Sequence, residues 1–154
     1  MLMLNEIIDK INNEMKRYGE NINDGAMDDE IEVFSNEVNK KLNIKLPQEY
    51  CIVLKLVNGL EFNGFIIYGI DEYLLKKDIN QHINGFIDNN LICYDNEWLK
   101  QYIFFGESDI SWYVYDISSK MYFEIDRPSE EKMVAFIISD WHRLFRLCTT
   151  SKRD

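Results

Sequence analysis

A short apolar segment that begins at Pro47 and ends at Gly59 constrains the fold more than any other part of the chain. Proline suits the first position of a helix, because its missing N–H has no intrahelical partner there and its φ is already helical. After Pro47, apolar residues cover most of the helix circumference, and only a narrow strip around Lys55 faces outward. A short helix with this pattern packs inside a domain. We therefore expect a buried helix that the Asn58-Gly59 pair terminates, followed by a strand within 62–70.

The length and charge of the chain limit what it can be. Its 154 residues suit a single domain, 1–154, and the sequence contains no repeat, linker or low-complexity tract. The formal net charge is −10, and the acidic residues are spread over the body of the chain. Such a surface repels phosphate, so we expect no nucleic-acid binding and instead attraction to basic proteins. Solubility alone is the alternative explanation for this acidity.

The sequence gives no sign of export or of membrane insertion. The N-terminus lacks the basic leader and apolar core of a signal peptide, and no apolar run approaches the roughly 20 residues that span a bilayer. Cys51, Cys93 and Cys148 are odd in number and have apolar neighbours, which is typical of buried, reduced thiols. We predict a cytoplasmic protein that makes no membrane contact.

Hydrophobic periodicity predicts helices in the first part of the chain and strands later. An amphipathic helix is expected over 3–18, and a second helix over 28–42 should end at Asn43 in the left-handed conformation. Strands are expected at 65–68, 102–105, 112–117 and 121–126. The last two should form an antiparallel hairpin, in which Met121, Phe123 and Ile125 share one face of their strand. Periodicity leaves 71–100 undecided, and 86–94 fits either a strand or a helix.

The C-terminal segment 129–148 also fits two structures. It can be one helix from about Ser129, or a strand over 134–138 followed by a helix that Ser139 caps. Helices at both ends with strands between them predict an α+β fold. We expect a mainly antiparallel central sheet with helices packed on it, helical at both the N- and C-terminal ends, and a frayed tail over 149–154.

The sequence contains no motif of a catalytic or metal site. It lacks the nucleophile elbow, the phosphate loop, the dinucleotide fingerprint and the zinc-protease motif, and it has no Cys-x-x-Cys pair. Asp140 and His142 are two positions apart, so a helix would point them in different directions. Cys51 and Cys148 have the spacing of core residues. We therefore predict that the protein is not an enzyme and uses no metal or cofactor.

Acidic and aromatic residues near the predicted strands remain as candidates for binding. Solvation is the usual state of such acids, and nothing in their spacing forces any two of them together. Aromatic residues are dense between 98 and 123, where packing is their commoner role. An antiparallel sheet needs helices on only one face, however. An aromatic side chain on the open face, among acids, would be an interface anchor.

Three sequence blocks within 28–148 occur in the order and spacing of a known family. The first covers 38–50, with Leu-Pro-Gln-Glu-Tyr at 46–50, and continues to the Asn-Gly pair at 58–59. The second covers 103–116 and the third 138–145. Together they resemble the SUKH superfamily, which includes fungal Smi/Knr cell-wall regulators and many bacterial immunity proteins. Asn39 and Asn43 stand where that family has an acid and a glycine.

The resemblance implies a SUKH-like α+β domain that acts by binding, with 1–18 as an added helix and a break at Ser139. It favours a cytoplasmic immunity protein that neutralises a cognate bacterial toxin, with a nuclease as one candidate. The alternative is a regulatory or scaffold module of the cell-wall-regulator type. In an immunity protein, acids would stand in for phosphates and aromatic residues would anchor the toxin. The candidate partner-binding residues are Glu61, Glu107, Asp109, Trp112, Tyr113 and Asp116.

Overall fold

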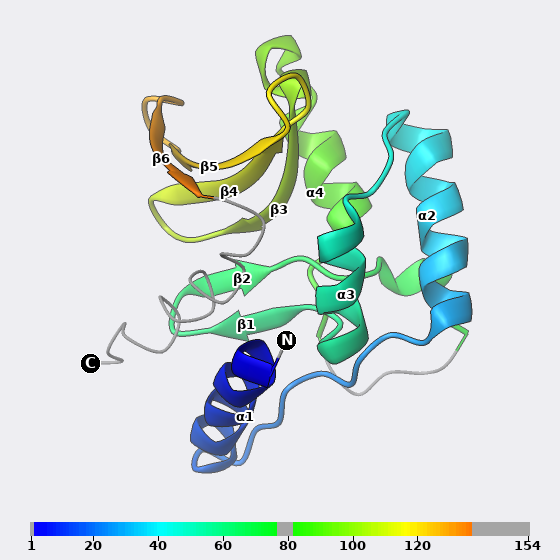
Figure 1. Cartoon of the computed structure of the whole chain (residues 1–154), viewed down its shortest axis with the longest axis vertical. Helices are drawn as coiled ribbons and strands as arrows, with labels where there is room; N and C mark the ends of the chain where they lie inside the picture. The colour runs from blue at the N-terminus through cyan, green and yellow to red at the C-terminus, as the bar shows by residue number, and fades with distance from the viewer. Residues whose placement is uncertain (1, 77–81, 137–154) are drawn as a thin grey trace.

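The computed structural model describes residues 2–76 and 82–136 and has an α+β fold (Figure 1). The helices are α1 (Leu2–Lys16), α2 (Asp28–Leu42), α3 (Gln48–Leu56) and α4 (Phe86–Cys93), with 3-10 helices η1 (Glu72–Leu74) and η2 (Glu97–Gln101). The strands are β1 (Leu60–Phe62), β2 (Phe65–Ile67), β3 (Tyr102–Glu107), β4 (Ser111–Asp116), β5 (Met121–Asp126) and β6 (Lys132–Phe136). They form one antiparallel sheet in chain order. This confirms the predicted fold class.

The helices that lead into the sheet lie close to their predicted positions. Acidic residues fill the first turn of α2 and lysines its last turn, where each complements the helix dipole. Asn43 then takes the left-handed conformation, with φ 56°. Helix α3 starts after Pro47 rather than with it, and it ends at Leu56 instead of at the Asn-Gly pair. Gly59 does have a left-handed φ of 82°, but it lies just before β1.

The strand predicted within 62–70 is one arm of a hairpin, β1–β2. Asn63 and Gly64 form the turn, and both have positive φ, 51° and 82°. A two-residue turn of this kind matches the twist of the flanking strands, and Asn-Gly is its strongest sequence signal. Strand β1 has only three residues, too few to show alternation. Periodicity therefore predicts one strand here and misses β1, and the turn signal of Asn63-Gly64 was not used in that prediction.

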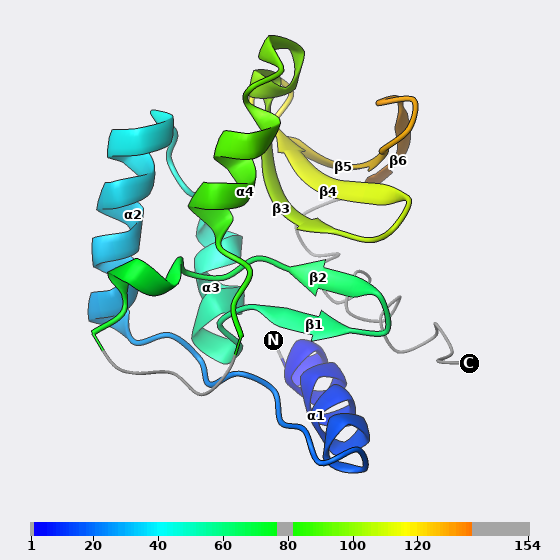
Figure 2. The same ribbon diagram turned by 180° about the vertical axis from the view of Figure 1, so that it is seen from behind.

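The middle of the sheet is buried on both faces. Residues 102–106 of β3 are all buried. Figures 1 and 2 show α3 and α4 next to each other on the helical side of the strands, with α4 beside β3. The ring of Tyr50 on α3 stacks on that of Phe86 on α4, with centroids 5.2 Å apart, and also approaches Phe105 on β3. In β5, Tyr122 and Ile125 are both fully buried although they face opposite ways. The simple one-sided alternation predicted for this strand is therefore incomplete.

A carboxylate from an earlier segment fixes the start of α4. Asp71 is buried, and its carboxylate accepts the N–H groups of Ile87 and Asp88 at 2.8 and 3.0 Å. Gly85 allows this approach, because a Cβ there would lie 2.2 Å from an oxygen of Asp71. Burial raises the pKa of Asp71 above its ordinary value. Residues 86–93 are helical in part because this distant side chain caps them, which periodicity cannot reveal.

A buried asparagine joins α4 to β3. The pairing of β2 with β3 stops near Tyr68, whose N–H donates to the carbonyl of Phe105. Beyond that point, the amide of Asn90 donates to the carbonyl of Phe104 at 2.7 Å and accepts its N–H at 2.8 Å. The side chain of Asn90 thus takes the place of a neighbouring strand.

The segment after β5 forms strand β6 rather than the start of a helix. Residues 132–136 pair with β5, so the single helix from Ser129 is wrong and the strand alternative is right over these residues. In the turn, the N–H of Ser129 donates to the carboxylate of Asp126 at 2.9 Å. The predicted break at Ser139, the C-terminal helix, Cys148, and the tail 149–154 lie outside the described residues.

Candidate interaction site

The six predicted partner-binding residues do not form one surface, and two of them lie inside the protein. Tyr113 and Asp116 are only 2% and 4% exposed. Tyr113 stacks on Phe65 across the sheet, with ring centroids 6.2 Å apart. Asp116 accepts the N–H groups of the two serines that follow it in the β4–β5 turn. Both side chains hold the sheet together and are not available to a partner in this structure.

Glu107 and Trp112 lie opposite each other on β3 and β4, and both contact Arg127. A guanidinium nitrogen of Arg127 lies 2.6 Å from Glu107 Oε2, and the guanidinium lies 5.3 Å from the centroid of the Trp112 ring. The hydroxyl of Tyr68 donates to the other oxygen of Glu107 at 2.9 Å. The charge of Glu107 is therefore compensated within the protein. This cluster links β3, β4, the residue after β2 and the turn after β5.

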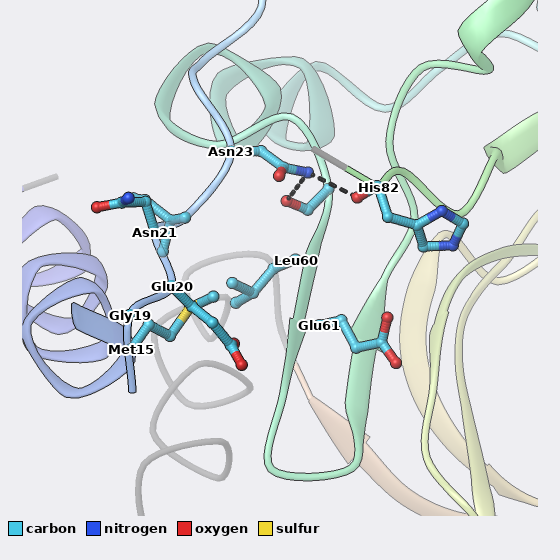
Figure 3. Close-up of a pocket in the computed structure, with 10 residues that line it drawn as sticks. Met15, Gly19, Glu20, Asn21, Asn23, Leu60, Glu61 and His82 are labelled. Carbon is cyan, nitrogen blue, oxygen red and sulfur yellow. Dashed lines mark hydrogen bonds between the residues drawn. The ribbon is translucent and has the colours of Figure 1, made fainter. Parts of the chain in front are cut away.

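The remaining two acids, Glu61 and Asp109, are exposed but lie on different parts of the sheet. Asp109 is in the β3–β4 turn. Glu61, on β1, lines a recess of about 640 Å³ beside the end of α1, together with Glu20 and His82 (Figure 3). Asn23 closes the inner side of this recess, because its amide donates to the backbone carbonyl of His82 at 3.1 Å.

Three exposed apolar side chains gather on α4 and η2. Ile92, Trp98 and Leu91 are 70%, 60% and 42% exposed. Backbone hydrogen bonds from Asp95 to Ile92 and from Asn96 to Cys93 form consecutive turns, which keep this segment compact. Figure 2 shows α4 on the outer side of the molecule. We call this the α4–η2 surface, and it consists of Asp88, Leu91, Ile92, Asp95, Glu97 and Trp98.

Acidic side chains accompany the apolar ones on the α4–η2 surface. Asp88, Asp95 and Glu97 are all exposed, and Lys100 lies 2.8 Å from Glu97. The backbone N–H of Trp98 donates to the side chain of Asn96, which caps η2 and fixes the backbone at this position. An exposed tryptophan close in the chain to exposed aliphatic side chains is typical of an interface centre, and acids near it favour a basic partner.

Sequence reasoning missed the α4–η2 surface because its apolar residues break the helical pattern. An exposed Ile92 next to a half-buried Cys93 makes 86–94 resemble a buried strand as much as a helix. The one available signal was local, since a tryptophan that closely follows Asp95 and Glu97 in a segment without clear periodicity is unusual for a core.

Residues 2–76 and 82–136 form no metal-binding cluster, and their two cysteines have raised pKa values. Within these ranges, no group of three or more His, Cys, Asp or Glu residues is placed to hold a metal ion. Burial raises the pKa of the Cys93 thiol to about 11 and also raises that of Cys51, so neither is a ready nucleophile near neutral pH. The same part of the chain has no helix with the length and apolar character to cross a membrane. His142 lies outside it.

The fold places the protein among α+β domains with an antiparallel sheet in chain order. A family model described as SMI1-KNR4 cell-wall, from the SUKH group, matches residues 28–143, which is more than half of the chain. The protein therefore belongs to the SMI1-KNR4 family of the SUKH superfamily, as the three sequence blocks predicted. The match starts at the first residue of α2 and leaves α1 outside. A search of curated proteins gave no match to this chain.

Family membership defines the general type of function. SUKH domains are generally non-catalytic modules of the immunity or cell-wall-regulator type.

Proposed function

We propose that this protein is a cytoplasmic immunity protein that neutralises a cognate bacterial toxin by direct binding, without catalysis and without a cofactor. The α4–η2 surface is the observation that carries the proposal. It combines Trp98 and Ile92, both largely exposed, with three exposed acids on a chain of net charge −10. The family contributes the general type of function.

The proposed mechanism has two parts that act in sequence. The negative charge of the protein first steers a basic toxin toward it, which raises the association rate at low salt. Trp98 and Ile92 then enter an apolar depression on the toxin, while Asp88 and Asp95 face its basic residues. A nuclease is a fitting toxin, because the basic groups that bind phosphate would be covered by carboxylates. Glu61, Asp109 and the half-buried Trp112 remain predicted contacts outside this centre.

The experiment uses the purified product of the neighbouring toxin-like gene and measures affinity by calorimetry. Truncation of a hot-spot residue costs at least about 2 kcal/mol, so Trp98→Ala should weaken binding by at least roughly 30-fold. Val33→Ala on α2 is the matched control, because Val33 is also an exposed apolar helix residue. Its affinity should stay within about threefold of wild type. In cells, Trp98→Ala should lose protection against the toxin and Val33→Ala should keep it.

Two outcomes distinguish a failure of the immunity hypothesis from a failure of the proposed binding site. If neither a complex nor protection is found, the immunity hypothesis fails. If the complex forms and Trp98→Ala binds like wild type, the immunity function stands and the α4–η2 surface is the wrong site.

The cell-wall description of the family model favours a second candidate, a regulatory or scaffold module. Such a module would bind a resident cellular protein, and no toxin gene would lie next to its own gene. Stable capture of one resident protein, weakened by Trp98→Ala and accompanied by no protection, would support this alternative.

A further inference from the structure

A groove of about 1150 Å³ lies where the end of α2, the start of α3 and the β4–β5 turn meet. Lys40, Lys45 and Lys120 line it, with Glu49 as the one acidic side chain of its lining. The rest of the protein carries an excess of acids, since the net charge is −10. The charge of the groove lining is therefore opposite in sign to the net charge of the protein.

The dipole of α2 explains the position of only one of these three lysines. Lys40 is in the last turn of α2, where a cation complements the helix dipole. Lys45 lies in the connection between α2 and α3, and Lys120 lies in the β4–β5 turn, so neither has that role. The ion pairs among residues 2–76 and 82–136 use other cations, namely Arg17, Lys55, Lys100 and Arg127. Lys45 and Lys120 take part in none of these ion pairs, and both line the groove.

The start of α3 adds to the positive character of the groove. Pro47, Gln48 and Glu49 all line it. Pro47 is the N-cap of α3 and provides no side-chain hydrogen bond to the first turn. The first N–H groups of a helix attract anions when no side chain caps them. The lysines and the start of α3 therefore both favour a negatively charged occupant.

The size and floor of the groove indicate a chain segment rather than a small molecule. Pockets for small ligands have volumes of about 300–1,000 Å³, and this groove is larger. Ile103, Tyr115 and the exposed Ile117 give it an apolar floor along the β3–β4 edge. An occupant that matches both the apolar floor and the lysines has apolar side chains that alternate with carboxylates. A phosphate backbone fits less well, because it brings no apolar side chains to lie on this floor.

We propose that this groove binds an extended acidic segment of a partner protein. Carboxylates of the segment pair with Lys45 and Lys120, and its apolar side chains lie on Tyr115 and Ile117. This interaction is independent of the proposed toxin binding, which uses the α4–η2 surface and a partner of the opposite charge.

A defined peptide tests the groove directly. The probe is a fluorescein-labelled eight-residue peptide that alternates Asp or Glu with Ile or Leu, and the control peptide has Lys at every acidic position. We expect the acidic peptide to bind with an affinity that falls as salt rises, and the basic peptide not to bind. The double variant Lys45→Gln/Lys120→Asn should weaken binding by about 2- to 30-fold, as expected for two exposed ion pairs. Asn is chosen at 120 because Lys120 has a positive φ of 59°.

A matched variant and a second readout make the result decisive. Lys10→Gln on α1 removes one exposed lysine far along the chain from the groove and should bind like wild type. Cys51 lines the groove whereas Cys93 does not, so the bound peptide should slow alkylation of Cys51 relative to Cys93. The proposal is overturned if the acidic peptide does not bind at millimolar concentration, or if the double variant binds it as wild type does. It is also overturned if a single-stranded oligonucleotide of equal charge displaces the peptide equally well.

Discussion

Replacing Asn90 with alanine tests whether one side chain substitutes for a strand next to β3. Asn90 is fully buried, and its amide makes both hydrogen bonds of the Phe104 backbone at this edge, at 2.7 and 2.8 Å. A third bond runs from its amide nitrogen to the carbonyl of Phe86 at 2.8 Å, one turn back in α4. Alanine keeps the helix but removes all three bonds.

The expected loss follows from the groups that are left without partners. The N–H and carbonyl of Phe104 would both be buried and unsatisfied, and each such group costs about 1–3 kcal/mol. The carbonyl of Phe86 can still accept its helical partner, so we assign it no cost. Asn90→Ala should therefore lower the free energy of unfolding by about 2–6 kcal/mol, a large part of the roughly 5–15 kcal/mol typical of a domain.

Urea denaturation followed by circular dichroism measures this loss, provided that the slope of the transition is unchanged. Asn89→Ala is the matched control, because the Asn89 amide makes a single partly buried bond to the carbonyl of Gly85. Its loss should stay near 1 kcal/mol. Equal and small losses in both variants would refute the idea that Asn90 replaces a strand.

Two further predictions concern titratable groups. Because burial raises the pKa of Asp71, the unfolded chain ionises this group more readily, and stability falls as pH rises from about 3.9 through the raised value. The unfolding free energy of Asp71→Asn relative to wild type should therefore increase as pH rises above about 3.9, and an unchanged difference would contradict the cause. With a pKa of about 11, Cys93 should react with iodoacetamide at pH 8 about 200-fold more slowly than a thiol of pKa near 8.5. Peptide mass spectrometry measures this rate, and a reduction of less than about tenfold would contradict burial of the thiol.

The parts of the fold that the sequence predicts are those whose signals are local. Asn43 ends α2 because a short polar side chain tolerates the left-handed conformation, and that tendency belongs to the residue itself. The turn at Asn63-Gly64 carries an equally local signal for the β1–β2 hairpin. By contrast, Asp71 and Asn90 act on segments that are 14 or more residues away in the chain. Residues 86–93 are helical in part because of such contacts, which the apolar pattern within 86–93 does not show.

The faces of the sheet show a second limit of sequence patterns. Period-two alternation tells which residues of β4 share a face, but not which faces are covered. Trp112 and Tyr113 point in opposite directions, and the choice between them as an interface anchor depended on an open face. Tyr113 is buried and stacks on Phe65 of β2, and Trp112 packs on Phe104 and Arg127. An anchor on the sheet could not be chosen from β4 alone.

The α4–η2 surface and the lysine-lined groove share a property that explains why one was missed and the other was not considered. A sequence pattern predicts structure by assuming that apolar residues are buried and charges are solvated. Ile92 and Trp98 violate the first assumption. Lys45 and Lys120 are ordinary surface lysines in sequence, and they share one groove only because α3 lies beside the β4–β5 turn. Binding surfaces are places where local rules are broken or where distant residues meet. The segments with the weakest periodicity, 86–100 and the connections around α3, are therefore where a partner should be sought first.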